Sequence, residues 1–70
     1  MKPGVYKHVR CTDVALEVNK VTRRSDGYSV VCRWLNVVNP NNVFRMDPDL
    51  HVEFITDTEL PNWRPYDAKL

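Results

Sequence analysis

The chain is poor in the residues that build common catalytic and cofactor sites. Its 70 residues include only two glycines, two cysteines and two histidines. Both glycines lie in segments that predict turns or loops, so no glycine-rich loop is available to cradle a phosphate. No pair has the C-x₂-C spacing typical of structural zinc among the possible ligands His8, Cys11, Cys32 and His51. We therefore expect no metal and no cofactor.

The carboxylates give no stronger sign of catalysis. Acidic residues cluster around predicted turns and strand ends, at Asp47, Asp49, Glu53, Asp57 and Glu59. Acidic side chains are common there because they cap and solvate the backbone. A nucleophile, base and orienting acid built from Cys11, His8 and Asp13 would require side chains to converge that strand alternation separates. We predict that the protein is not an enzyme.

Long hydrophobic runs are also absent. No stretch approaches the ~20 consecutive apolar residues that span a bilayer, and residues 1–4 lead into charged residues instead of an apolar signal core. We expect no membrane association and a cytoplasmic location, where cysteines stay reduced. Cys11 and Cys32 fall on apolar phases and are expected to pack as small buried thiols. A disulfide would form only if their strands were neighbours.

Size and composition predict one small globular domain. Hydrophobic residues make up 43% and charged residues 27% of the chain, which are values typical of folded proteins. A domain this short has a thin stability margin, so both a monomer and a weak homodimer that covers an edge strand are considered. The net charge of +1 and the pI of 7.8 are low for a strongly basic nucleic-acid-binding domain.

Two strand-like runs, Asp13–Thr22 and Tyr28–Val38, are the strongest positive signal. Apolar residues alternate with polar ones along both runs, a two-residue period that predicts pleated strands. The Asp26-Gly27 step between them is expected to supply the positive backbone dihedral of a tight hairpin turn. Near Asn19 the alternation slips by one residue, which predicts a β-bulge.

Shorter strands are predicted on either side of this hairpin. They cover Val5–Cys11, Val43–Met46 and Leu50–Ile55, separated by turns at Asn39-Pro40-Asn41-Asn42 and Asp47-Pro48-Asp49. In the first of these strands, Val5, Val9 and Cys11 share one phase and Tyr6 is expected on the opposite face, exposed or under the tail. In the last, Leu50, Val52 and Phe54 alternate with His51, Glu53 and Ile55, which predicts a half-buried strand.

This order of strands predicts an all-β fold, a small five-stranded SH3-like or OB-like barrel. Residues 1–4 would form an N-terminal loop, residues 5–55 the barrel strands, and residues 56–70 an irregular tail with Pro61, Trp63 and Pro65 that packs on the barrel. Asp57–Leu60 is expected to form one helical turn, capped by Thr56 or Asp57. A three-stranded meander with the tail across it is the alternative.

The segment from Cys32 to Phe44, with the sequence CRWLNVVNPNNVF, resembles short uncharacterised proteins of phages and prophages. The resemblance implies a mobile-element origin. It carries no functional motif.

Three aromatic residues outside the central hairpin are candidates for a protein-binding groove. Tyr6, Trp63 and Tyr66 could line a surface that holds an extended or proline-rich peptide. In the alternative, Trp63 is an anchor that pins the tail over one end of the barrel, where burial offsets the entropy of ordering the tail.

One basic cluster offers a second candidate surface. Lys20, Arg23 and Arg24 approach the hairpin tip, and Arg33 lies on the facing strand. Such a tip could contact phosphates, giving weak and salt-dependent binding without sequence readout. Taken together, the sequence predicts a non-catalytic small β-barrel module that binds a protein partner. Weak nucleic-acid binding through the basic tip is the alternative.

Overall fold

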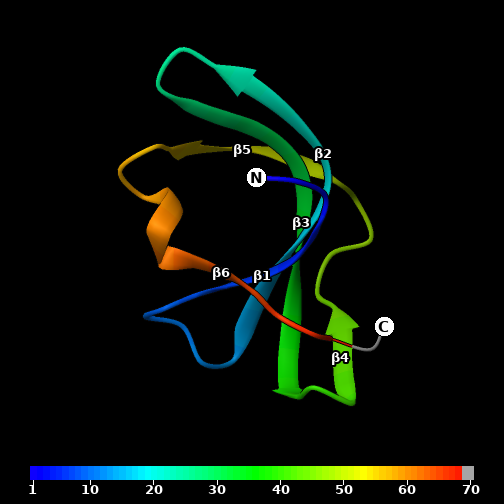
Figure 1. Cartoon of the computed structure of the whole chain (residues 1–70). Coiled ribbons are helices and arrows are strands. Elements are labelled where there is room, and N and C mark those ends of the chain that lie inside the picture. The colour runs from blue at the N-terminus through cyan, green and yellow to red at the C-terminus, as the bar shows by residue number, and fades with distance from the viewer. Residues whose placement is uncertain (69–70) are drawn as a thin grey trace.

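Two long strands organise the molecule, which was analysed as a computed structural model that describes residues 1–68. Strands β2 (Val14–Arg24) and β3 (Gly27–Asn39) form an antiparallel hairpin with a pronounced bend (Figure 1). Their register shifts between Val18 and Lys20, so the predicted bulge at Asn19 is confirmed. The extra residue adds local twist and lets the hairpin contribute to two differently oriented parts of one sheet.

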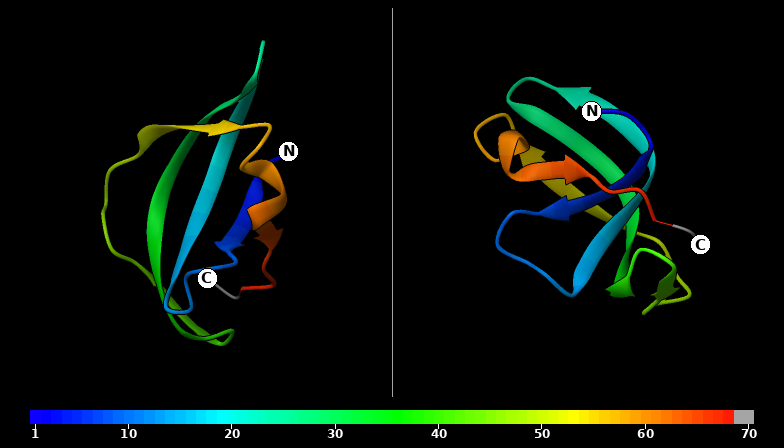
Figure 2. Two further views of the ribbon diagram at one scale, coloured as in Figure 1. Left: turned by 90° about the vertical axis from the view of Figure 1, so that its left-hand side faces the viewer. Right: turned by 60° about the horizontal axis from the view of Figure 1, so that its bottom comes forward.

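Within residues 1–68, six antiparallel strands form a single sheet, which confirms the all-β prediction. The shorter strands are β1 (Gly4–His8), β4 (Asn42–Arg45), β5 (His51–Thr56) and β6 (Trp63–Pro65). The order is β4-β3-β2-β1-β6, and β5 pairs with the part of β3 nearest the hairpin tip. Figure 2 shows β5 crossing over the hairpin, with β1 and β6 on the other side of the concave face. Among the described residues no ladder joins β5 to β1 or β6, so the sheet is open there.

Gly27 is required for a different reason from the one predicted. It does not have a positive φ, and the turn residues are Ser25 and Asp26. A Cβ on Gly27 would clash with the backbone carbonyl oxygen of Ile55 and would lie 2.8 Å from the Cα of Thr56. Glycine therefore allows β5 to lie close against the start of β3.

Apolar side chains are buried on both faces of the sheet. The larger cluster lies on the concave face and contains Tyr6, Leu16, Val18, Val30, Cys32 and Ile55. The smaller cluster is built from Ala15, Leu35 and Val37, whose positions alternate with those of the first cluster along β2 and β3. Because β3 is covered on both sides, it is the central strand, as its nearly continuous apolar sequence predicts.

The first strand is shorter than predicted, and its faces are reversed. β1 ends at His8, Tyr6 is buried on the concave face, and Val9 is exposed just beyond the strand. Val5 packs instead against the smaller cluster. Cys11 is only partly buried, whereas Cys32 is fully buried, and both are free thiols.

The tail contains a short strand that its sequence did not indicate. The 3₁₀ turn η1 (Leu60–Asn62) leads into β6, which pairs with β1. The backbone N–H of Glu59 donates to the Thr56 hydroxyl at 3.1 Å in the turn before η1. The helical turn itself starts later than predicted, and its N-cap residue Glu59 makes no side-chain capping hydrogen bond. Within residues 1–68 no helix is long and apolar enough to cross a membrane.

Candidate functional site

Strand β5 carries its apolar residues on the surface of the molecule. The cross-strand partners of His51, Glu53 and Ile55 are residues of β3 whose side chains face the concave core. Strand alternation therefore directs Val52 and Phe54 to the opposite, outer face, and the exposed Leu50 immediately precedes the strand. These three side chains, which we call the β5 strip, are 41%, 65% and 49% exposed.

The β5 strip contains three of the large hydrophobic residues that are exposed in the described chain. Seven large hydrophobic residues are exposed among residues 1–68, and five of them fall between residues 44 and 54. Phe44 pairs with Asn36 and Met46 hydrogen-bonds to Trp34, so their side chains lie on the same face of the sheet as the Trp34 side chain. The β5 strip lies on the opposite, outer face. Scattered apolar residues need no explanation, but several on successive outward positions of one strand indicate an interaction surface.

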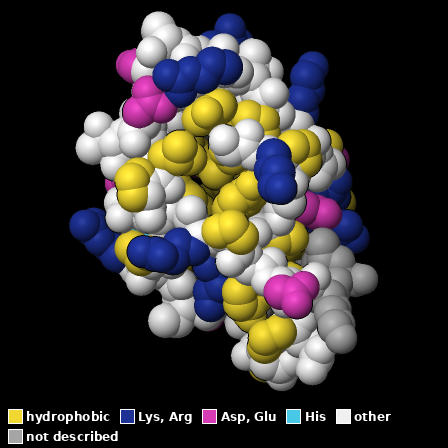
Figure 3. Space-filling view, viewed as in Figure 1, with side chains coloured by type: hydrophobic (Ala, Val, Ile, Leu, Met, Phe, Trp, Pro, Cys, Tyr) yellow, Lys and Arg dark blue, Asp and Glu magenta, His cyan; other side chains and the backbone are white. Residues whose placement is uncertain are grey.

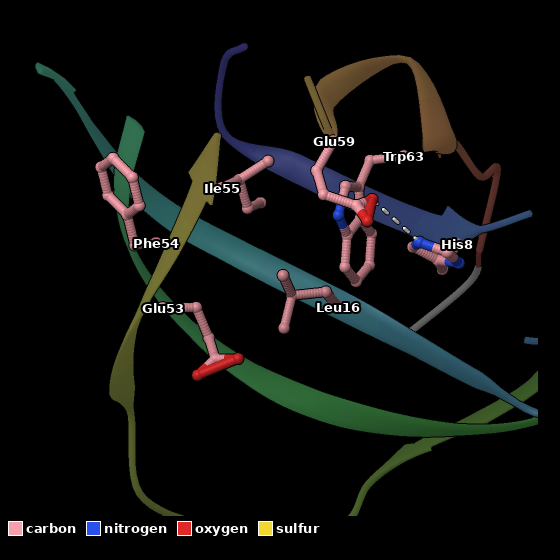
Figure 4. A pocket seen from close by; sticks show the side chains of 7 residues that line it. All are labelled: His8, Leu16, Glu53, Phe54, Ile55, Glu59 and Trp63. Carbon is pink, nitrogen blue, oxygen red and sulfur yellow. Dashed lines mark hydrogen bonds and ion pairs between the residues drawn. The ribbon is translucent and has the colours of Figure 1, made fainter. Parts of the chain in front are cut away.

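A cleft of about 210 Å³ lies on the concave side of β5. Figure 4 shows Leu16 at its floor, with Glu53 and Ile55 on one wall and Trp63, Glu59 and His8 on the other; the Phe54 ring points away from it. On the face drawn in Figure 3, hydrophobic side chains gather around a central hollow, and Lys and Arg side chains lie among and around them.

One wall of this cleft is held by a polar cluster. His8 Nε2 lies 3.4 Å from Glu59 Oε2, which also accepts a 2.9 Å hydrogen bond from the Asn62 side chain. The hydrogen bond from Asn62 and the interaction with His8 lower the pKa of Glu59. The Trp63 ring packs edge-on against the His8 ring at 5.1 Å. The cluster fixes Trp63 over the core and leaves Glu59 ionised at neutral pH.

A cysteine and a histidine also meet on this face. Cys32 Sγ lies 3.8 Å from His51 Nε2, and the His51 ring stacks on Trp34 at 6.5 Å. Burial, with a smaller effect of Glu53, raises the pKa of Cys32 to about 11. The thiol is thus protonated at neutral pH, whereas a cysteine nucleophile needs the thiolate. Among the described residues no cluster of three or more potential metal ligands forms.

The three aromatic residues predicted to form a groove do not share one surface. Tyr6 is buried, and its hydroxyl donates a 2.6 Å hydrogen bond to the carbonyl of Lys2. Tyr6 and Tyr66 line a second hollow of about 350 Å³ near the N-terminus. Trp63 lines the β5 cleft and packs against the larger core cluster, the position expected of an anchor.

The four predicted basic residues are dispersed. Arg23 makes a two-point ion pair with Asp57, with N–O distances of 2.6 and 3.0 Å, and its guanidinium lies over the Tyr28 ring. Arg33 is far from the hairpin tip. Its Nε lies 3.3 Å from Glu17 Oε1, and its Nη1 donates a hydrogen bond to the carbonyl of Pro48. Lys20 and Arg24 are exposed and, by register, lie on the outer face. The tip is therefore less basic than the sequence suggests.

The β5 strip was missed because the alternation of residues 50–55 predicts a half-buried strand without showing which phase is exposed. His51, Glu53 and Ile55 share the phase that faces inward, although Ile55 is its only aliphatic residue. Nothing in the sequence marks this more polar phase as the buried one. Comparison with known proteins adds no further assignment, since no family model, curated protein or solved structure matches the chain. The resemblance of residues 32–44 to phage proteins stays a prediction.

Proposed function

We propose that this protein is a non-catalytic module that binds another protein through the edge and the outer face of β5. The observation that carries the proposal is the exposed β5 strip of Leu50, Val52 and Phe54. Among the described residues β5 pairs only with β3, so its other edge offers backbone hydrogen-bonding groups as well. Strand addition uses this combination: the backbone ladder supplies affinity, and alternate side chains supply specificity.

The sequence of β5 supports this proposal because it lacks most of the devices that prevent strand pairing, and its one carboxylate, Glu53, lies on the inward phase. Soluble proteins commonly blunt edge strands with lysine, proline or bulges. β5 reads HVEFIT and contains neither lysine nor proline, and its register with β3 is continuous from Gly27 to Cys32. An unprotected apolar edge is a liability unless it has a partner.

An SH3-like architecture is part of the proposal. In its support, β2 and β3 contribute to two parts of a bent sheet, and a 3₁₀ turn links β5 to β6 beside β1. A barrel left open between β5 and β6 leaves β5 with an edge to offer.

The proposed absence of catalysis rests on the chemistry of the concave face. The cysteine nearest a histidine is a buried thiol with a raised pKa, and the Glu59 carboxylate is held by Asn62 and His8. Nucleic-acid binding at the tip is the weaker alternative, because two of its four cations are engaged in ion pairs with Asp57 and Glu17.

A selection of short random peptides on immobilised protein tests the proposal. Bound peptides should shift the backbone amide signals of His51 to Phe54 in NMR spectra. Val52→Lys should abolish binding, because it places a charge in the middle of the strip. Val38→Lys is a matched control, since Val38 is 63% exposed and Val52 is 65% exposed.

Two outcomes would contradict the proposal. Selected peptides that shift the signals of His8 and Trp63 instead would assign recognition to the cleft. Equal binding by the Val52→Lys and Val38→Lys variants would show that the strip takes no part.

A further inference from the structure

The outward backbone groups of β5 follow from its ladder with β3. The N–H of Asp57 donates to the carbonyl of Asp26 at 2.9 Å, in the same register as the β3–β5 pairs. In an antiparallel ladder, hydrogen-bonded and non-hydrogen-bonded pairs alternate. The odd-numbered residues from His51 to Asp57 therefore bond to β3, and the N–H and C=O groups of Val52 and Phe54 point to the open edge.

We infer that the partner at this edge is a second copy of the same chain, paired antiparallel through β5 about a two-fold axis at Val52. The inference rests on the proposed function and names the occupant of the same surface. A symmetric dimer requires the same segment on both subunits to be complementary to itself. The run Leu50-His51-Val52-Glu53-Phe54 meets this requirement.

Two positions to either side of Val52 the run has an apolar residue, Leu50 or Phe54. One position to either side it has a polar residue, an imidazole at His51 and a carboxylate at Glu53. In this register Val52 faces its own counterpart, and Leu50 faces Phe54 of the second copy. These pairs extend the apolar strip across the dimer, and cross-strand apolar pairs stabilise sheets. On the concave face His51 Nε2 lies 3.7 Å from Glu53 Oε2 of its own chain. In the dimer His51 also lies opposite Glu53 of the second copy, where the imidazole and that carboxylate can form a hydrogen bond.

Neighbouring symmetric registers lack this match. An axis at His51 places the two imidazoles opposite each other, where neither meets a carboxylate, and an axis at Glu53 places the two Glu53 carboxylates opposite each other. Like charges directly opposite each other destabilise a strand pair. Registers shifted by an odd number of residues would set the outward backbone groups of one strand against the inward groups of the other. The register at Val52 is therefore favoured by backbone, apolar and charged groups together.

Sedimentation equilibrium over a wide concentration range tests self-association. The mass of the whole chain should rise from 8.2 kDa toward twice that value as concentration increases. Val52→Lys places two ammonium groups opposite each other and should raise the dimer dissociation constant about tenfold or more. Val38→Lys should leave it unchanged. Circular dichroism on each variant establishes that the fold is retained.

Cysteine cross-linking tests the register. In a Cys11→Ser background, Val52→Cys should form an intermolecular disulfide on mild oxidation, because directly opposite hydrogen-bonded residues have Cα atoms about 5.5 Å apart. Glu53→Cys is the control and should cross-link poorly, since its counterpart lies diagonally. Efficient linking through Glu53→Cys but not Val52→Cys would overturn the register.

Complementary charge variants test the His51–Glu53 pair. His51→Glu and Glu53→Lys should each weaken the homodimer, and mixing the two variants should give a heterodimer tighter than either.

Two failures can be told apart. A chain that stays monomeric at millimolar concentration would overturn the second copy as partner, yet selected peptides that bind β5 would still support the proposed function. A dimer that persists in the Val52→Lys variant would overturn the β5 interface, and it would count against both the proposed homodimer and the proposed binding function of the β5 strip.

Discussion

Replacing Gly27 with alanine tests how closely β5 lies against the hairpin. The added Cβ would lie 2.8 Å from the Cα of Thr56 and 3.0 Å from Cζ of Phe54, and it would clash with the carbonyl oxygen of Ile55. The Phe54 ring can rotate away, but the two backbone atoms belong to the paired strand. The substitution therefore requires β5 to move away from β3.

The expected magnitude follows from two opposing effects. Overpacking against fixed atoms costs about 1–3 kcal/mol, whereas a glycine-to-alanine change recovers about 0.4–1 kcal/mol of unfolded-state entropy at an unstrained site. The steric cost prevails, and we expect Gly27→Ala to lower the free energy of unfolding by about 1–2 kcal/mol. For a domain of this size that is a fall of about 4–16 °C in Tm.

Urea unfolding followed by tryptophan fluorescence measures this change, with Ser29→Ala as the control on the same strand and face. The control should change the free energy of unfolding by about 0.5 kcal/mol or less. Faster hydrogen exchange at the β5 amides of Gly27→Ala would localise the damage. Unchanged stability and exchange in Gly27→Ala would refute the close approach of β5 to β3, and with it the backbone directions assigned to β5.

Three further predictions concern other parts of the molecule. A thiol reagent should label Cys11 rapidly and Cys32 only on unfolding, and rapid labelling of both thiols would contradict this. Since burial raises the pKa of Cys32 to about 11, the contribution of Cys32 to stability should be constant below about pH 9 and should be lost as pH rises toward 11. The pKa of Asp57, lowered by its hydrogen bonds with Arg23, should return to its ordinary range in Arg23→Ala when followed by NMR titration, and an unchanged value would contradict the ion pair. Trp63→Ala should lower the free energy of unfolding by ~3–5 kcal/mol in urea denaturation if Trp63 anchors the tail, and a loss below ~1 kcal/mol would return Trp63 to the binding-groove interpretation.

The central hairpin could be predicted because its signals are local and agree with one another. Alternation along β2 and β3 gave both strands, and the slip near Asn19 gave the bulge that the register confirms. The turn after Asn39 was also predictable, because its side chain accepts a 2.9 Å hydrogen bond from the N–H of Asn41. Each of these features depends on residues close together in sequence.

The tail strand and the faces of β1 depend on distant residues. β6 is only three residues long and includes a proline, and it is a strand because β1 provides its hydrogen-bonding partners. The ladder is prolonged by the N–H of Tyr66, which donates to the carbonyl of Val5 at 2.9 Å. In β1 itself both phases carry an apolar residue, and both faces of the sheet have a core. Alternation therefore could not decide that Tyr6, with the larger side chain, fills the concave side.

The basic residues failed to converge because the hairpin is long. Arg24 pairs with Gly27 at the tip, whereas Arg33 pairs with Glu17. Six residues of extended strand separate Gly27 from Arg33, about 20 Å at 3.3 Å per residue. Nearness in sequence across a turn implies nearness in space only for residues beside that turn.

The outward apolar residues of β5 remain exposed within one chain. In an isolated domain, the outer apolar residues of an edge strand gain little from folding, and the monomer buries only Ile55 of this strand below one-tenth exposure. On the concave side, Leu60, Trp63 and Met1 pack against the core cluster to which Ile55 belongs. The packing of the monomer thus accounts for the inward phase and leaves the outward phase without a role. A second β5 strand across the open edge supplies that role, because it gives the strip apolar neighbours and gives the outward backbone groups partners.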